Sequence, residues 1–232
     1  MFAAVLIAAL HVPLVLMYHR VDVSSPADPT SQALTVSPEQ FDAEMAVLAR
    51  EGLEAISVDQ YVLRLRLHEP TDHVVLVTFD DGYSDQYLYA VPILARYGYS
   101  ATFFVNTASI GRHNHLSWEQ LRVMKDDGMS IEAHGVDHVD LAALPPARQA
   151  FEIGHCVAAL REHLGEAVVA FAYPSGAFDA ATMRIVADSG MTFGFTTDSA
   201  RRLWANSPYD LSRIRIKRDL APAQFAQLLG VP

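Results

Sequence analysis

The chain has 232 residues, which suits one domain and is enough to bury a large core without disulfides. Its formal net charge of -10 argues against nucleic acid as a partner, because binding that polyanion relies on Lys and Arg. Hydrophobic residues make up 51% of the chain and charged residues 19%, so we expect a single globular domain over 1–232 rather than a disordered or repeat protein. Cys156 is the only cysteine, which excludes an intrachain disulfide.

The chain begins with an apolar stretch, Met1 to Leu10, that runs almost directly into a second apolar segment ending at Tyr18. No basic region precedes it and Pro13 divides it, which argues against a complete export signal or a membrane anchor. We therefore expect residues 1–12 to be either the remnant of an export signal or a disordered extension. Residues 14–18 are predicted to form the first strand, and we expect no stable membrane insertion of the domain.

Helix start signals recur along the chain. Ser37 to Gln40 has the pattern of a capping box with proline at the first helical position, and predicts a helix to about Arg50. Ser57 to Gln60 and Ser117 to Gln120 repeat the pattern, ahead of predicted helices over 61–67 and 121–125. Further helices are predicted near 84–97, 146–163, 179–188 and 222–229.

Short apolar runs alternate with these helices, and several lack the polar alternation of half-exposed strands. Parallel strands covered on both faces have this composition. Seven or eight βα units predict a closed or nearly closed barrel, with active-site groups at the carboxyl ends of the strands. The candidate strands are 14–18, 54–56, 73–79, 101–105, 130–133, 168–173, 191–195 and 211–216.

Polar clusters follow four of these strands. In a barrel the carboxyl ends of the strands converge on one mouth, although these residues are scattered from 19 to 176 in the sequence. The sequence therefore predicts one site rather than four separate features. The clusters are His19, the pair Asp80 and Asp81, the pair His134 and His138, and Tyr173 to Gly176.

Asp80 and Asp81 lie where the apolar run from His73 to Val77 opens into a loop. Adjacent side chains on an extended segment point in opposite directions, so the two carboxylates should have different neighbours. One would bind a metal while the other handles protons. On this motif alone, an ordinary turn in which one carboxylate caps the next helix is an equally open interpretation.

His134 and His138 are four residues apart, so on a helical turn both imidazoles would face one side and bind one ion. A surface or core pair of histidines is the alternative. Asp81 is the candidate third ligand, because two histidines and one carboxylate leave open positions on zinc or a similar metal. Asp137, between the histidines, is expected to face away or to support the ligands.

Thr78 to Asp81, with His134 to His138 downstream, resembles the polysaccharide deacetylase family, carbohydrate esterase family four. That resemblance implies a distorted, complete or incomplete (β/α) barrel of seven or eight units. The order of motifs is similar to one branch, which includes poly-N-acetylglucosamine deacetylases and has its catalytic histidine near the N-terminus, where this chain has His19. Segments 16–21, 77–82, 101–105, 134–138 and 171–176 carry the likeness, which covers most of the chain.

The resemblance implies a role for each of these positions. Asp80 would be the general base, His19 the general acid, and Asp81, His134 and His138 the ligands of one divalent metal ion. Zn²⁺ is the expected ion, with Co²⁺, Ni²⁺ and Mn²⁺ as alternatives. The backbone N–H of Ser175, flanked by Tyr173 and Pro174, matches the position that stabilises the oxyanion and binds substrate. Apart from the resemblance, Tyr83 is a candidate to stack on a sugar ring because it follows the acidic pair; core or rim packing is the alternative.

These roles agree with the chemistry of amide hydrolysis. A metal would polarise the carbonyl and lower the pKa of its bound water, while Asp80 takes the proton of that water. An amine leaves badly unless it is protonated, and His19 could supply that proton.

The chain departs from the family pattern at the position of an arginine that holds the catalytic aspartate in many members. Ala172 stands there, so the role of this arginine is either lost or taken over from elsewhere. Arg213, near the end of the predicted strand 211–216, is the candidate to support Asp80 from another direction; an exposed strand arginine is the alternative. Gly135 and Val139 also depart from common residues, but both changes spare the ligands.

We therefore expect a metal-dependent hydrolase that removes N-acetyl groups from a polysaccharide or oligosaccharide containing N-acetylglucosamine. An O-acetyl esterase on xylan-like glycans or a cyclic amide hydrolase would keep the same site. A carbohydrate-binding domain without catalysis is a third hypothesis, which rests only on the missing arginine. The substrate class favours the cell envelope or secretion, and the sequence leaves location and oligomeric state open.

Overall fold

The computed structural model describes residues 10–11, 13–24, 28–165, 167–199, 204–205 and 207–230. Most of the segment expected to be an export-signal remnant or an extension, 1–12, lies outside these residues. Its last part, β1 (Leu10–His11), pairs antiparallel with β11 (Trp204–Ala205). Among the described residues, no helix combines the length and apolar character needed to cross a membrane.

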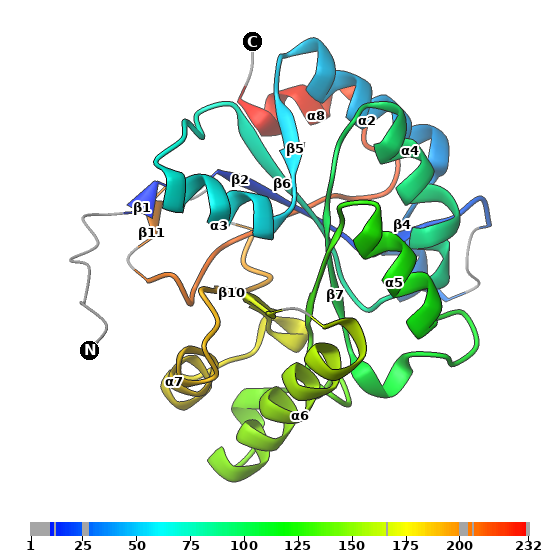
Figure 1. Ribbon diagram of the computed structural model, residues 1–232. Coiled ribbons are helices and arrows are strands. Elements are labelled where there is room, and N and C mark those ends of the chain that lie inside the picture. Colours follow the sequence, from blue (N-terminus) through cyan, green and yellow to red (C-terminus); the bar gives the residue numbers. More distant parts are fainter. Residues whose placement is uncertain are drawn as a thin grey trace.

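Eight strands form one curled parallel sheet (Figure 1). Their order is β10-β9-β8-β7-β6-β2-β12, and β5 also pairs with β6. A parallel bridge from Leu211 to Phe195 of β10 turns the sheet back towards its other edge. The fold is therefore a distorted, incomplete barrel, one of the two forms that were predicted. The strands are β2 (Leu14–Tyr18), β5 (Glu54–Ile56), β6 (Val74–Phe79), β7 (Thr102–Val105), β8 (Ser130–Ala133), β9 (Ala170–Ala172), β10 (Phe193–Phe195) and β12 (Ile214–Arg215).

Helices α2, α4, α5, α6 and α7 follow one another around the outside of this sheet (Figure 1). The capping boxes predicted at Ser57 and Ser117 are confirmed, whereas the side chain of Gln40 donates to Glu44 and to the carbonyl of Lys217 instead of the cap. A small ladder of β3 (Arg20–Val21) and β4 (Thr35–Val36) was not predicted. The helices are α1 (Pro29–Ala33), α2 (Pro38–Arg50), α3 (Val58–Leu67), α4 (Val91–Arg96), α5 (Trp118–Asp126), α6 (Pro146–Leu164), α7 (Ala180–Asp188) and α8 (Pro222–Leu229).

The helix predicted near 84–97 is split into a π-helical turn, Gln86–Ala90, and α4. The N–H of Val91 donates to the carbonyl of Gln86, five residues back, instead of four. Pro92 follows directly, and proline has no N–H to continue an α-helical ladder. Single π turns of this kind are frequent at functional sites.

Two apolar cores lie on opposite faces of the curled sheet. Leu16, Val77 and Phe103 belong to the outer core, between the sheet and the surrounding helices. Their sequence neighbours Val15, Leu76 and Phe104 belong to the inner core, inside the curl. Alternate residues of each strand therefore face in and out. The inner face continues towards the carboxyl ends of the strands, where the candidate site residues lie.

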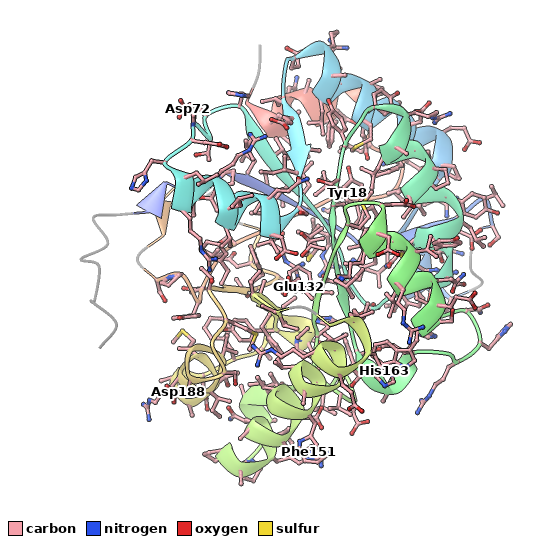
Figure 2. All side chains as sticks on the ribbon, viewed as in Figure 1. Tyr18, Asp72, Glu132, Phe151, His163 and Asp188 are labelled. Atoms are coloured by element: carbon pink, nitrogen blue, oxygen red, sulfur yellow. The ribbon has the colours of Figure 1, made fainter. Side chains whose placement is uncertain are left out.

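Helix α3 covers the amino ends of the strands. The N–H of Val58 donates to the hydroxyl of Thr102 at the start of β7, and Tyr61 stacks on Phe193 with ring centroids 5.7 Å apart. Inside the curl, Glu132 is fully buried and accepts the N–H groups of Val169 and Ala170, which ties β8 to β9 (Figure 2). Helix α3 thus closes the amino ends of the strands, and the polar site residues lie at the carboxyl ends.

Glu44 of α2 shows how burial in the outer core changes the pKa of a carboxyl group. The hydroxyl of Tyr18 donates to it over 2.8 Å, and Gln40 donates to its other oxygen. Burial raises the pKa of Glu44 to about 7, against the opposing effect of these hydrogen bonds. The folded protein therefore holds a proton that the unfolded chain releases at lower pH, so Glu44 lowers stability as the pH rises towards 7.

We predict that Glu44→Gln flattens the fall in unfolding free energy between pH 5 and pH 7, by up to about 1.4 kcal/mol per pH unit. Urea denaturation at pH 5, 6 and 7 measures this slope. Glu39→Gln, which changes an exposed residue of the same helix, is the control and should keep the wild-type slope. A Glu44→Gln slope equal to that of the wild type would show that this carboxyl titrates normally.

Candidate active site

The predicted site residues meet at the carboxyl ends of neighbouring strands. Tyr18 at the end of β2 pairs with Phe79 at the end of β6, so His19 and Asp80 follow at the same level. The side-chain amide of Gln86 donates to the backbone carbonyls of both His19 and Asp80, each over 2.7 Å. This amide fixes the two strand ends relative to each other.

Asp80 is held by a buried, two-point pair with Arg213. The two terminal nitrogens of the guanidinium donate to the two carboxylate oxygens over 2.7 and 2.6 Å. Arg213 also donates to the hydroxyl of Thr78 and to the carbonyl of Thr196, so N–H groups that do not face Asp80 also have acceptors. Arg213 is 0% exposed, which excludes the alternative of an exposed strand arginine.

Asp81 faces a different set of neighbours from Asp80. Its backbone has a φ of 71°, in the left-handed region, and this conformation turns its carboxylate away from Arg213. Its Oδ1 lies 3.4 Å from Nε2 of His134 and 3.2 Å from Nε2 of His138. Neither contact has hydrogen-bond geometry, so Oδ1 is a buried oxygen without a hydrogen bond. The two acids are thus divided, and neither caps the next helix.

The orientation of His134 is set by the backbone of β9. Its Nδ1 lies 2.7 Å from the carbonyl of Ala172. A carbonyl only accepts hydrogen bonds, so Nδ1 carries a proton that it donates to Ala172, and Nε2 is the nitrogen turned towards Asp81. An imidazole nitrogen and a carboxylate oxygen that face each other need a cation or a proton between them. Metal-binding histidines commonly donate their other ring N–H to a backbone carbonyl, as Nδ1 of His134 does here.

The loop that carries His138 corrects the expectation of a helical turn. Residues 134–140 are not helical; Gly135 with a φ of 81° and His138 with a φ of 53° fold the loop so that the two imidazoles come together. The rings are 4.9 Å apart. Glu152 of α6 accepts the N–H groups of Val136 and Asp137, which fixes this shape.

The donor set fits a divalent transition metal ion. Asp81, His134 and His138 offer ligand atoms that all lie within 4.8 Å of one another. Two imidazole nitrogens and one carboxylate oxygen suit zinc and leave positions open for water and substrate. The unsatisfied Oδ1 of Asp81 and the orientation of His134, which turns Nε2 towards this oxygen, are the observations that favour an ion here. Asp137 faces away and pairs with Arg148.

The charges of the site depend on these contacts. Burial alone would raise the pKa of Asp80, but Arg213, His134 and His19 hold it below its ordinary value. Burial also opposes ionisation of Asp81, and the two imidazoles outweigh it, so the pKa of Asp81 is lowered as well. The same contact with Asp81 raises the pKa of His138. Both carboxylates are therefore ionised near neutral pH.

His19 is buried, and its imidazole is mostly uncharged at pH 7. Burial lowers its pKa, and the nearby carboxylates of Asp80 and Asp81 offset this only in part. The imidazole is therefore mostly unprotonated at pH 7.

The turn after β9 contains Ser175, whose φ of 56° is left-handed, and the residue is exposed. Tyr173 differs from expectation: its side chain is 0% exposed, stacks on Phe178 and donates to the carbonyl of Tyr209. The side chain of Tyr173 therefore supports the turn from inside and has no surface to offer a substrate. Pro174, the first residue of the turn, is likewise buried.

Tyr83 forms part of a stacked cluster beside Asp81. Its ring lies 5.2 Å from the ring of His115, at an interplanar angle of 30°, and the guanidinium of Arg20 lies 4.9 Å from its centroid. Burial, followed by the charge of Asp81, raises the pKa of Tyr83 to about 12. Its phenol therefore stays protonated beside the acidic pair.

Sequence reasoning missed three polar residues that shape the site. Gln86 and Glu152 bind backbone groups from within helical segments, and Asn106 follows β7 at the level of His134. Asn106 alone had a usable signal, because it is a polar residue directly after an apolar strand.

Comparisons with known proteins show the family to which the chain belongs. Residues 68–194 match the family model for polysaccharide deacetylase. The chain is 31% identical to YxkH of Bacillus subtilis over 91% of this chain and 74% of that protein. The chain belongs to the polysaccharide deacetylase family. The family was therefore identified correctly from its motifs, and the chain is a member of a family of deacetylase enzymes.

Two solved structures and one further enzyme extend the comparison. Deacetylase PplD of Streptococcus pyogenes, in complex with acetate, has a TM-score of 0.85 and 33% identity, covering 94% of this chain and 97% of that one. IcaB of Ammonifex degensii has a TM-score of 0.77 and 28% identity, covering 94% and 95%. A poly-beta-1,6-N-acetyl-D-glucosamine N-deacetylase of Staphylococcus aureus is 21% identical over 80% of this chain and 69% of its own length.

The matched residues 68–194 include the acidic pair and both histidines of this deacetylase. His19 and Arg213 lie outside that range, one on each side. The two ends of the chain therefore contribute the groups that contact or adjoin Asp80.

The Arg213–Asp80 pair predicts a specific pattern of stability. We expect Arg213→Met to destabilise the metal-free protein by about 3–5 kcal/mol, because it leaves the carboxylate of Asp80 buried and unpaired. The double variant Arg213→Met/Asp80→Asn removes both charges and should be more stable than Arg213→Met alone. Urea denaturation of both variants measures the difference.

Arg215→Met, two residues further on and only half-buried, is the control and should cost much less than Arg213→Met. If the double variant were less stable than Arg213→Met by the full cost of Asp80→Asn, the two side chains would not be coupled.

Proposed function

We propose that this deacetylase is a metal-dependent hydrolase that removes N-acetyl groups from a polysaccharide or oligosaccharide containing N-acetylglucosamine. The observation that carries the proposal is the division of the acidic pair. Asp81 turns an unsatisfied oxygen to two histidines, while Asp80 lies beside it on a buried arginine. One carboxylate is thereby suited to a metal and the other to a proton.

Asp81, His134 and His138 would hold the ion, with Zn²⁺ the best fit to two nitrogens and one oxygen. Co²⁺, Ni²⁺ and Mn²⁺ can occupy similar sites. A bound ion supplies polarisation of the acetyl carbonyl and makes a neighbouring water more acidic. The contact from Ala172 to His134 and the contacts from Glu152 to the histidine loop keep these ligands in place.

Asp80 is the proposed general base. Its lowered pKa keeps it ionised near neutral pH, so it can accept a proton from the attacking water. Arg213 engages both of its oxygens and leaves a second lone pair on each for the water. Arg213 thus fixes the orientation of the Asp80 carboxylate. In many family members an arginine at the position of Ala172 has this role.

His19 is the proposed general acid for the leaving amine. Because burial keeps it neutral at rest, it must receive a proton during the reaction before it can donate one. Asp80, at the same level of the adjacent strand, holds the proton taken from water. Passing this proton from Asp80 to His19 and then to the amine nitrogen returns both groups to their starting states and yields acetic acid and a free amine; the acid then loses its remaining proton to solvent as acetate.

Ser175 and Tyr83 would bind the substrate around this centre. The backbone N–H of Ser175 is the proposed donor to the oxyanion, held by the buried side chains of Tyr173 and Pro174. Tyr83, stacked on His115, would present its ring to a sugar. The Staphylococcus aureus relative acts on a poly-N-acetylglucosamine and thus supports this substrate class for the present chain.

The test is acetate release from chitin oligomers, poly-N-acetylglucosamine, peptidoglycan and acetylxylan, after chelation and after adding Zn²⁺ or Co²⁺. We predict release from the N-acetylglucosamine substrates that is lost on chelation and restored by metal. Release from acetylxylan alone would favour an O-acetyl esterase instead. A protein inactive on the whole panel with every metal would overturn the proposal.

Two variants make this test specific to the site. Asp80→Asn should lower kcat by roughly 10²- to 10⁴-fold while Zn²⁺ still binds, because it removes the base and keeps the ligands. Asp137→Asn is the matched control, since this exposed aspartate lies between the two histidines and faces away from them; it should keep wild-type activity. An Asp80→Asn variant with full activity would exclude Asp80 as the base.

A further inference from the structure

Asn106 is a buried polar residue at the mouth of the sheet with no role in the mechanism above. It follows β7 directly and is 6% exposed. Although it stands at the N-cap position of a short 3-10 turn (Thr107–Ser109), its side chain makes no capping hydrogen bond. An asparagine at this position ordinarily caps the turn, so this side chain points elsewhere.

The backbone places Asn106 on the inner face, next to His134. Phe104, two residues earlier, belongs to the inner core, and Asn106 is extended with φ -90° and ψ 123°, so the alternation continues to it. The N–H of His134 donates to the carbonyl of Val105, and the N–H of Thr107 donates to the carbonyl of Gly135. Asn106 therefore lies between these two bonds, alongside His134.

The strand order places the same residue next to Asp81. β7 lies between β6, which leads into Asp80 and Asp81, and β8, which leads into His134. Neighbouring strands are about 4.8 Å apart. Since Asp81 and His134 converge across the end of β7, Asn106 is the inward-facing residue beneath their meeting point.

The side-chain oxygen of Asn106 has no hydrogen-bond partner. A buried acceptor left unpaired is destabilising, so such a group in a site calls for a donor that binds there. A water in an open coordination position of the ion is such a donor. It has two protons, of which Asp80 is proposed to accept one.

We propose that Asn106 is a further residue of the metal site, whose Oδ1 accepts a hydrogen bond from the second proton of this water. The proposal rests on the proposed function, because it needs the ion held by Asp81, His134 and His138. With one proton directed to Asp80 and the other to Asn106, a water beside the ion would be held in one orientation. Asn106 thus acts as a positioning residue and also stabilises the bound ion.

The experiment measures Zn²⁺ affinity without substrate, by competition with a chromogenic chelator at pH 7. Asn106→Leu has a similar volume but no acceptor, and should weaken Zn²⁺ binding by roughly 10- to 100-fold, the usual effect of losing a residue that supports a ligand. Asn106→Asp keeps the acceptor and should bind Zn²⁺ at least as tightly as the wild type. Thermal unfolding of the metal-free proteins checks that each variant folds, and Asn106→Ala replaces the leucine variant if that one does not.

Equal Zn²⁺ affinity of Asn106→Leu or Asn106→Ala and the wild type would overturn the proposal, because an asparagine that contacts only a sugar would not affect the ion without substrate. A wild-type protein that binds no Zn²⁺, Co²⁺, Ni²⁺ or Mn²⁺ would instead overturn the proposed function and this inference together. Tight binding by the wild type with weakened binding by the leucine variant supports both.

Discussion

The buried pair between Arg213 and Asp80 connects parts of the chain that are 133 residues apart. Its guanidinium also reaches the hydroxyl of Thr78, two residues before Asp80, and the carbonyl of Thr196, directly after β10. One side chain thus links the middle of the sheet to the edge at β10. An isolated buried carboxylate would take up a proton, whereas the paired carboxylate stays ionised and keeps one direction.

The division of labour between Asp80 and Asp81 follows from this pair. Two neighbouring carboxylates would repel each other if both faced the same space, and one would take up a proton. The left-handed backbone of Asp81 and the guanidinium of Arg213 separate them. Asp81 is then free to meet the histidines, whose own orientation comes from Ala172 and Glu152. The metal side and the proton side of the site are therefore built by different parts of the fold.

Sequence predicted the features that depend on local patterns. The apolar runs predicted the strands, and the serine caps predicted the starts of α3 and α5. Polar residues at strand ends predicted where the site lies. These signals are local because strand alternation and capping act within a few residues. The helical turn at His134 was wrong because spacing alone does not distinguish a helix from a loop folded by Gly135 and supported by Glu152.

Contacts between distant residues were harder to predict. For Arg213, support of Asp80 and an exposed position on a strand were both open from the sequence, because nothing near Arg213 in the sequence indicates Asp80 as its partner. Gln86 lies in a helical segment with no pattern that marks its amide as a link between His19 and Asp80. Tyr173 was expected near substrate from its place beside Ser175, but its ring fills the interior beneath the turn. Such roles depend on the whole fold.

Diffraction from Zn²⁺-soaked crystals, with data collected on both sides of the zinc absorption edge, tests directly whether Asp81 and Asp80 have separate roles. We predict one anomalous peak about 2.0–2.2 Å from an oxygen of Asp81 and from the Nε2 atoms of His134 and His138, with Asp80 still paired to Arg213. A peak coordinated by Asp80, with the guanidinium displaced, would contradict the division of the two carboxylates.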